Sequence, residues 1–211
     1  MDDPVAALEA QQHELAAIVA EAREADLLRP SRCPGWTVAD VLLHLAQTNE
    51  MAVASVEGRL GQHVDEVAAR IPQVGGIDAW AGAFVDLERG DAVGARDRWR
   101  ASATAQVDAF AATDPAARVG WVVGEMAART LATTRLTECW IHTVDVAVAF
   151  GPPPPQPGTA APGTDWLTLN IFSPDPAPAA GLPVLVWIPG GGYLIGSGSQ
   201  PEFDGAVLAT G

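Results

Sequence analysis

GEMAARTLATTRLTECWIHTVDVAVAF, residues 124–150, is the clearest helical segment of this chain. Its polar residues Arg135, Glu138, His142 and Asp145 recur at spacings of three and four, so on a helix they form one stripe. Apolar residues cover most of the remaining surface, and a glycine followed by prolines ends the segment. The stripe either faces solvent along a narrow strip or faces a cavity inside a bundle of helices.

A metal site can be built from this stripe and one residue of an earlier segment. Glu138 and His142 are four residues apart and project from the same helix face. His44 ends the sequence WTVADVLLH, residues 36–44, which also has helical character. Two imidazoles and one carboxylate, with a fourth position left for water or a thiol, are typical of a catalytic zinc site. Taken alone, a histidine among apolar residues, as His44 is, is more often a hydrogen-bonded core residue than a metal ligand.

The first two-thirds of the chain contains three further segments with helical periodicity. Thr37 is a good N-cap, and Asp40 stands in the capping-box position behind it. Residues 78–89 are a candidate for an additional helical piece, whereas residues 63–76 are expected to be irregular or weakly helical. Four long helices joined by modest connections predict an up-and-down four-helix bundle. The predicted long helices are 3–24, 37–57, 95–112 and 124–150.

Two motifs resemble those of one enzyme family. CPGWTVADVLLHL, residues 33–45, and RLTECWIHTVD, residues 135–145, are similar to segments of mycothiol-dependent maleylpyruvate isomerases, which belong to the DinB-like metalloprotein superfamily. The resemblance covers residues 1–151 and implies a mainly α, DinB-like four-helix bundle. It also implies a divalent metal, usually zinc, bound by His44, Glu138 and His142.

The same resemblance implies thiol-dependent isomerase or transferase chemistry on a small-molecule substrate, with mycothiol or another low-molecular-weight thiol as cofactor. Two further residues are candidates for catalysis. Asp145 either orients the imidazole of His142 or is a surface helix charge. Arg135 either meets a substrate carboxylate, pairs with Glu138 or points outward. Of the two cysteines, Cys139 is expected in the core, and the resemblance implies a structural Cys33.

The composition changes after residue 151. Residues 152–162 form a proline-rich linker, and residues 166–172 and 184–188 are predicted strands. Residues 163–211 resemble the first part of a type-B carboxylesterase, a short β appendage like the start of an α/β-hydrolase. In that family the N–H groups of Gly191 and Gly192 would form the oxyanion hole.

This segment departs from the esterase pattern in the residues that carry catalysis. No Gly-x-Ser-x-Gly motif follows the glycines, and no histidine follows His142 in these 211 residues. Ester hydrolysis is therefore an alternative function for which this segment lacks the nucleophile motif and the base. A non-catalytic metal-binding fusion protein is another alternative. The predicted strands offer a route to self-association, because their edges lack covering strands.

The composition excludes some partners. With 26 acidic and 12 basic residues, the net charge of −14 argues against nucleic acids and anionic membranes, which require clustered cations. No apolar run is long enough to span a membrane. The N-terminus lacks the pattern of a secretory signal, so we expect a cytoplasmic protein.

Overall fold

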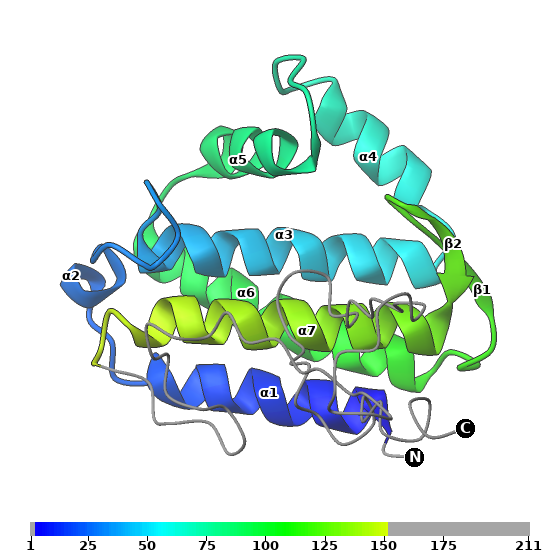
Figure 1. Cartoon of the computed structure of the whole chain (residues 1–211), viewed down its shortest axis with the longest axis horizontal. Coiled ribbons are helices and arrows are strands. Elements are labelled where there is room, and N and C mark those ends of the chain that lie inside the picture. The colour runs from blue at the N-terminus through cyan, green and yellow to red at the C-terminus, as the bar shows by residue number, and fades with distance from the viewer. Residues whose placement is uncertain (1–2, 152–211) are drawn as a thin grey trace, which may run out of the picture. The chain divides into compact units, whose positions relative to one another are not determined.

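Four long helices form the bundle in the computed structural model of the protein, which describes residues 3–151. They are α1 (Pro4–Ile18), α3 (Val38–Val56), α6 (Ala92–Ala111) and α7 (Ala128–Ala147) (Figure 1). The prediction of a mainly α four-helix bundle is therefore confirmed. Three shorter helices and one antiparallel hairpin complete this part of the chain: α2 (Glu24–Leu27), α4 (Leu60–Ala68), α5 (Ile77–Glu88), β1 (Arg118–Trp121) and β2 (Gly124–Ala127).

The connectivity differs from the predicted up-and-down order. Helices α3 and α6 are neighbours that run in the same direction, and so are α1 and α7 (Figure 1). The reason lies between α3 and α6, where α4 and α5 carry the chain back to the end at which α3 began. A long crossover connection of this kind makes parallel neighbours possible in a four-helix bundle. The up-and-down prediction is therefore wrong.

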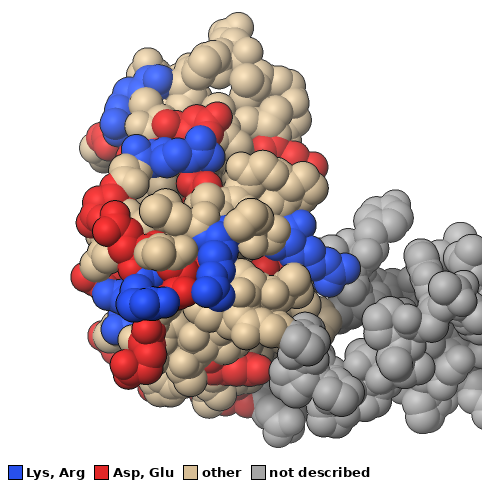
Figure 2. Space-filling view, turned by 90° about the vertical axis from the view of Figure 1, so that its left-hand side faces the viewer, with Lys and Arg blue, Asp and Glu red and all other residues tan. Residues whose placement is uncertain are grey.

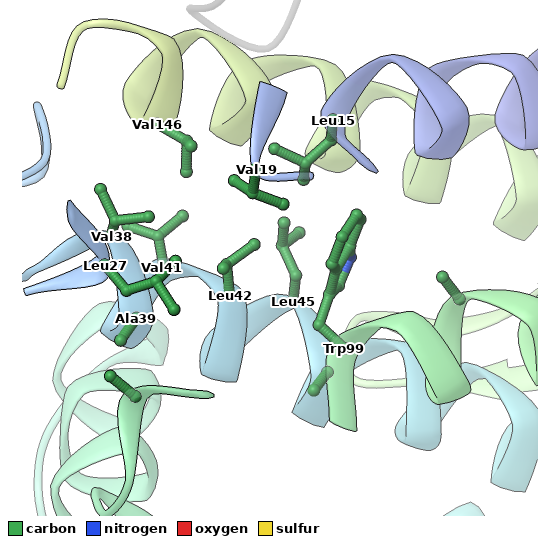
Figure 3. Packing of buried hydrophobic residues seen from close by; sticks show 13 residues of the cluster. Leu15, Val19, Leu27, Val38, Ala39, Val41, Leu42, Leu45, Trp99 and Val146 are labelled. Carbon is green, nitrogen blue, oxygen red and sulfur yellow. The ribbon is translucent and has the colours of Figure 1, made fainter. Parts of the chain in front are cut away.

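Helix α3 is the central element of the bundle. The Thr37 side chain accepts a hydrogen bond from the Asp40 backbone N–H, and the Asp40 carboxylate accepts one from the Thr37 N–H, so the predicted capping box is confirmed. Most residues of α3 are buried, because α4, α5, α6 and α7 all pack against it. Figure 3 shows Leu42 and Leu45 pointing from α3 toward Trp99, Leu15 of α1 and Val19, which directly follows α1.

Several predicted boundaries need correction. Helix α7 begins at Ala128 rather than Gly124, because residues 124–127 pair with β1 as a strand. Gly124 has a φ of 115°, a value that favours glycine and lies outside the helical range, so the helix cannot start at this residue. Residues 60–68 form α4, so the helical alternative holds for the first part of segment 63–76, which was predicted as irregular or weakly helical. The first predicted helix ends at Ile18, and α2 follows as a separate turn of helix.

The surface of the bundle carries both signs of charge. Figure 2 shows basic and acidic side chains interspersed on one face, without a continuous basic area on that face. Among residues 3–151 no helix combines the length and the apolar character needed to cross a membrane. The linker 152–162, the predicted strands 166–172 and 184–188, and the candidate oxyanion residues Gly191 and Gly192 lie outside the described residues.

Candidate metal centre

Helices α3 and α7 bring the three predicted ligands together. His44 on α3 lies opposite Glu138 on α7, with 3.0 Å between His44 Nε2 and Glu138 Oε1. His142 stands one turn further along α7, and its Nε2 lies 3.5 Å from the same carboxylate oxygen. The two imidazole rings meet edge to face, with centroids 5.1 Å apart. Three side chains from two helices thus converge on one point.

The spacing of these atoms fits a metal ion. Two ligand atoms bound about 2.0–2.1 Å from a tetrahedral zinc lie roughly 3.3–3.4 Å apart. The donor atoms of His44, Glu138 and His142 all lie within 4.8 Å of one another. Small side-chain adjustments would therefore bring all three to bonding distance, and the donor set is one that zinc prefers.

The charge states of two of these groups suit metal binding. Burial lowers the pKa of His44, and the hydrogen bond to Glu138 opposes that shift only in part. Burial alone would raise the pKa of Glu138, but hydrogen bonds with His142 and His44, together with the Arg135 charge, hold that pKa well below its usual range. A neutral imidazole and an ionised carboxylate are the forms in which these residues bind metals.

The other ring nitrogen of His142 also has partners. His142 Nδ1 lies 3.0 Å from Asp145 Oδ2, and because an ionised carboxylate only accepts, Nδ1–H is the donor. The Cys33 thiol donates to the same oxygen at 3.3 Å. Burial disfavours the charged imidazole, yet hydrogen bonds with Asp145, Cys33 and Glu138 raise the pKa of His142 to about 11. Asp145 is thus not an isolated surface charge.

Arg135 does not point outward, contrary to one of the sequence interpretations. Its side chain is 9% exposed, and its guanidinium lies 4.7 Å above the Trp121 ring. The nearest carboxylate oxygen, Glu138 Oε2, is 4.0 Å from NH2, and the buried Nε has no hydrogen-bond partner among the described residues. Burial lowers the pKa of Arg135, and Glu138 opposes that shift. A guanidinium with spare donors thus borders the ligand cluster.

Two neighbours of the cluster were not recognised as such in the sequence. The Trp36 ring packs against His44, with 5.3 Å between centroids, and Cys33 faces His142 and Asp145. Both stand in the loop before α3. The one indication in the sequence that they lie near the cluster was their position just before the helix that carries His44. Cys139 is buried in the core as expected, and burial raises its pKa to about 12.

Comparison with known families gives two matches. Residues 8–147 match the mycothiol maleylpyruvate isomerase N-terminal domain, which accounts for most of the chain. Residues 132–211 match the carboxylesterase family. Both resemblances inferred from the motifs are confirmed, and the esterase match also includes most of α7, from residue 132 on.

Individual relatives divide in the same way. The chain is 30% identical over 154 residues to an uncharacterized protein of Mycobacterium tuberculosis strain H37Rv. This alignment covers 72% of this chain and 59% of that protein. It is 42% identical over 82 residues to the para-nitrobenzyl esterase of Bacillus subtilis, covering 35% of this chain and 16% of the esterase. The chain thus spans less than two thirds of either relative.

A solved structure supports the fold. The crystal structure of the mycothiol-dependent maleylpyruvate isomerase aligns with a TM-score of 0.51 and 18% sequence identity. The alignment covers 68% of this chain and 59% of that protein. At this identity the likeness establishes a shared bundle architecture.

Proposed function

Because the chain belongs to the mycothiol maleylpyruvate isomerase N-terminal domain family, we propose that it binds a zinc ion at the His44, Glu138 and His142 cluster and catalyses a thiol-dependent isomerisation or transfer. The ligands are His44 Nε2, Glu138 Oε1 and His142 Nε2. The observation that carries the proposal is the convergence of these three atoms from two helices within 4.8 Å of one another. Mycothiol or another low-molecular-weight thiol is the cofactor, and the cytoplasm, where thiols stay reduced, is the expected compartment.

The bound zinc would supply the acidity that keeps the cofactor sulfur as a nucleophilic thiolate. The protein residues around the ligands have distinct tasks. Asp145 accepts the Nδ1–H of His142 and so holds the ring with Nε2 directed toward the centre, where a metal would displace the Nε2 proton. The indole of Trp36 packs on His44 and limits the freedom of that ring. The ligands therefore keep their orientation before the substrate arrives.

The reacting molecule is a small electrophile with a negatively charged group. The buried guanidinium of Arg135 has donors to spare, and a carboxylate would satisfy them with a bidentate pair. Addition of a thiolate to an unsaturated carbon removes the double bond, so rotation about that bond becomes possible. Loss of the thiol then yields the isomer, whereas protonation of the neighbouring carbon from solvent, with the new C–S bond kept, yields a transfer product. With a halogenated acid, the thiolate forms the C–S bond and halide leaves.

Metal content tests the first part of this proposal. The full-length protein, purified without a metal-affinity tag, is analysed beside His142→Ala and the control His13→Ala, which alters an exposed histidine. We expect at least one zinc per chain in the wild type and the control, and none in His142→Ala. Equal zinc in all three proteins, or none in any after zinc is supplied, would refute the ligand assignment.

Turnover tests the second part. Zinc-loaded protein is incubated with mycothiol and maleylpyruvate, with and without a chelator, and isomerisation is followed by absorbance. A second assay follows transfer of the thiol to other unsaturated or halogenated acids. Activity that needs both zinc and the thiol supports the proposal. A zinc-loaded protein that is inactive in both assays supports the non-catalytic alternative instead.

Ester hydrolysis is a second candidate function, favoured by the carboxylesterase match over residues 132–211. A nitrophenyl ester assay with and without chelator separates the possibilities. Hydrolysis by a serine triad is indifferent to a chelator, whereas hydrolysis by zinc-bound hydroxide is abolished by it.

A further inference from the structure

His142 directs its two ring nitrogens at two different sets of donor atoms. Nε2 faces Glu138 and His44, and Nδ1 faces Asp145 and Cys33. We propose that Cys33 Sγ, Asp145 Oδ2 and His142 Nδ1 form a second metal position, which takes a thiophilic divalent ion such as zinc or cadmium. This position goes beyond the proposed catalytic centre, with which it shares one imidazole ring.

The distances between the three atoms suit one ion. Asp145 Oδ2 lies 3.0 Å from His142 Nδ1 and 3.3 Å from Cys33 Sγ, and 3.9 Å separates Cys33 Sγ from His142 Nδ1. Around a tetrahedral zinc, a nitrogen and an oxygen ligand lie roughly 3.3 Å apart, and a sulfur lies roughly 3.6 Å from either. Each observed distance is within about 0.3 Å of these values, a movement that side-chain rotation provides.

The backbone holds Cys33 in place before any ion binds. The Arg32 N–H donates to the Asp145 carbonyl at 3.1 Å and ties the loop directly to α7. Within the loop, the Ser31 hydroxyl accepts from the Cys33 N–H, and the Ser31 N–H donates to the Trp36 carbonyl. The thiol therefore needs no rearrangement of the loop to act as a ligand.

The donor set differs in kind from that of the first centre. A thiolate is a soft ligand and favours zinc, cadmium or cobalt over magnesium or calcium. Cys33, His142 and Asp145 are each partly exposed, so an ion can reach them from solvent. When the ion binds, the protons of the thiol and of Nδ1 pass to solvent. With both positions occupied, the Nε2 proton is released as well, and the imidazolate ring of His142 would lie between the two ions.

Cobalt titration tests the proposal, because a thiolate bound to Co²⁺ gives a charge-transfer absorption in the near ultraviolet that histidine and carboxylate ligands lack. The metal-free full-length protein is titrated with Co²⁺ in the presence of a phosphine reductant. We expect two equivalents, with the charge-transfer band in the wild type. Cys33→Ser should bind one equivalent without the band. Cys139→Ala, which alters the only other cysteine of the chain, should keep the band.

His44→Ala separates this proposal from the first centre. The expected result is loss of one equivalent with the band retained. A wild type that shows the band at a single equivalent, kept in His44→Ala and lost in Cys33→Ser, supports the thiol position while refuting the first centre. Absence of the band in the wild type overturns the proposal, as does its persistence in Cys33→Ser or its loss in His44→Ala. Asp145→Asn provides a second variant, and we expect it to weaken the band at least tenfold at subsaturating cobalt.

Discussion

His44 Nε2 and Glu138 Oε1 lie 3.0 Å apart although 94 positions separate the two residues in the chain. The contact exists because α3 and α7 pack side by side, with His44 on the face of α3 that meets α7. In the metal-free protein this contact is a hydrogen bond, so a ligand pair is already assembled before an ion binds. The following predictions test what depends on it.

Glu138→Gln should abolish tight zinc binding. The amide keeps the size of the side chain but removes the negative charge that the ion needs, so we expect the zinc Kd to rise more than about 100-fold, beyond the loss seen for outer partners. Competition with a chromophoric chelator measures the Kd. Glu9→Gln, at an exposed position, is the matched control and should bind zinc as the wild type does. An unchanged Kd in Glu138→Gln would contradict the assignment.

Asp145→Asn should weaken zinc binding less severely. The carboxylate that accepts the Nδ1–H of His142 is lost, but all three ligands of the proposed centre remain, so we expect a Kd about 10–100 times higher. The same competition assay measures it, with circular dichroism to verify that α7 is intact. Asp97→Asn, which alters a carboxylate that is 59% exposed, should leave the Kd unchanged. Equal zinc affinity in the two variants would show that Asp145 is only a surface helix charge and does not orient His142.

Asp40→Asn should destabilise the bundle in a pH-dependent way. Burial opposes ionisation of Asp40, but hydrogen bonds from the Thr37 N–H and Arg89 hold its pKa below the usual value. A lowered pKa in the folded state adds stability above the unfolded pKa of about 3.9, and this is lost as the pH falls through the folded pKa. We expect a loss of about 1–2 kcal/mol at pH 7 that shrinks below about pH 4.

Urea unfolding at several pH values measures this difference. Asp65→Asn serves as the control, because that carboxylate is exposed. A difference between wild type and Asp40→Asn that stays constant down to pH 2 would show that the ionised carboxylate is not the source of the stability.

Leu42→Ala should be strongly destabilising. Leu42 is fully buried in the cluster that joins α1, α3, α6 and α7, so its truncation leaves a cavity and costs about 2–5 kcal/mol of unfolding free energy (Figure 3). Leu28→Ala removes the same atoms at a position that is 54% exposed and should cost less than about 0.5 kcal/mol. Denaturant unfolding of both variants makes the comparison. Similar losses would mean that Leu42 does not lie in the stabilising core.

Arg135→Met should stabilise the fold and weaken the binding of a carboxylate substrate. The guanidinium is buried, lacks a hydrogen bond at Nε and has its nearest carboxylate at 4.0 Å. Replacement by an apolar side chain of similar length should therefore raise the unfolding free energy by on the order of 1 kcal/mol. The KM of a carboxylate substrate should increase because its partner is lost. A stability loss above about 2 kcal/mol would show that stacking on Trp121 outweighs the desolvation of the charge.

The local features of the chain were readable in the sequence. Thr37 and Asp40 are three residues apart, and the capping box they form depends only on that spacing. Glu138 and His142 share a helix face for the same reason. The start of α7 was misplaced because residues 124–127 continue the helical pattern, whereas their pairing with β1 depends on residues earlier in the chain.

What the sequence by itself determined is that the chain forms four long helices, where α3 begins, and that an imidazole and a carboxylate stand one turn apart on α7. Each of these depends on interactions within a few residues. Only the tertiary structure decided that α3 and α6 run parallel, that Arg135 is buried against Trp121, and that Cys33 meets the far side of the His142 ring. These contacts join residues remote in the chain, and their geometry follows from how the helices pack, which spacing along the chain does not specify.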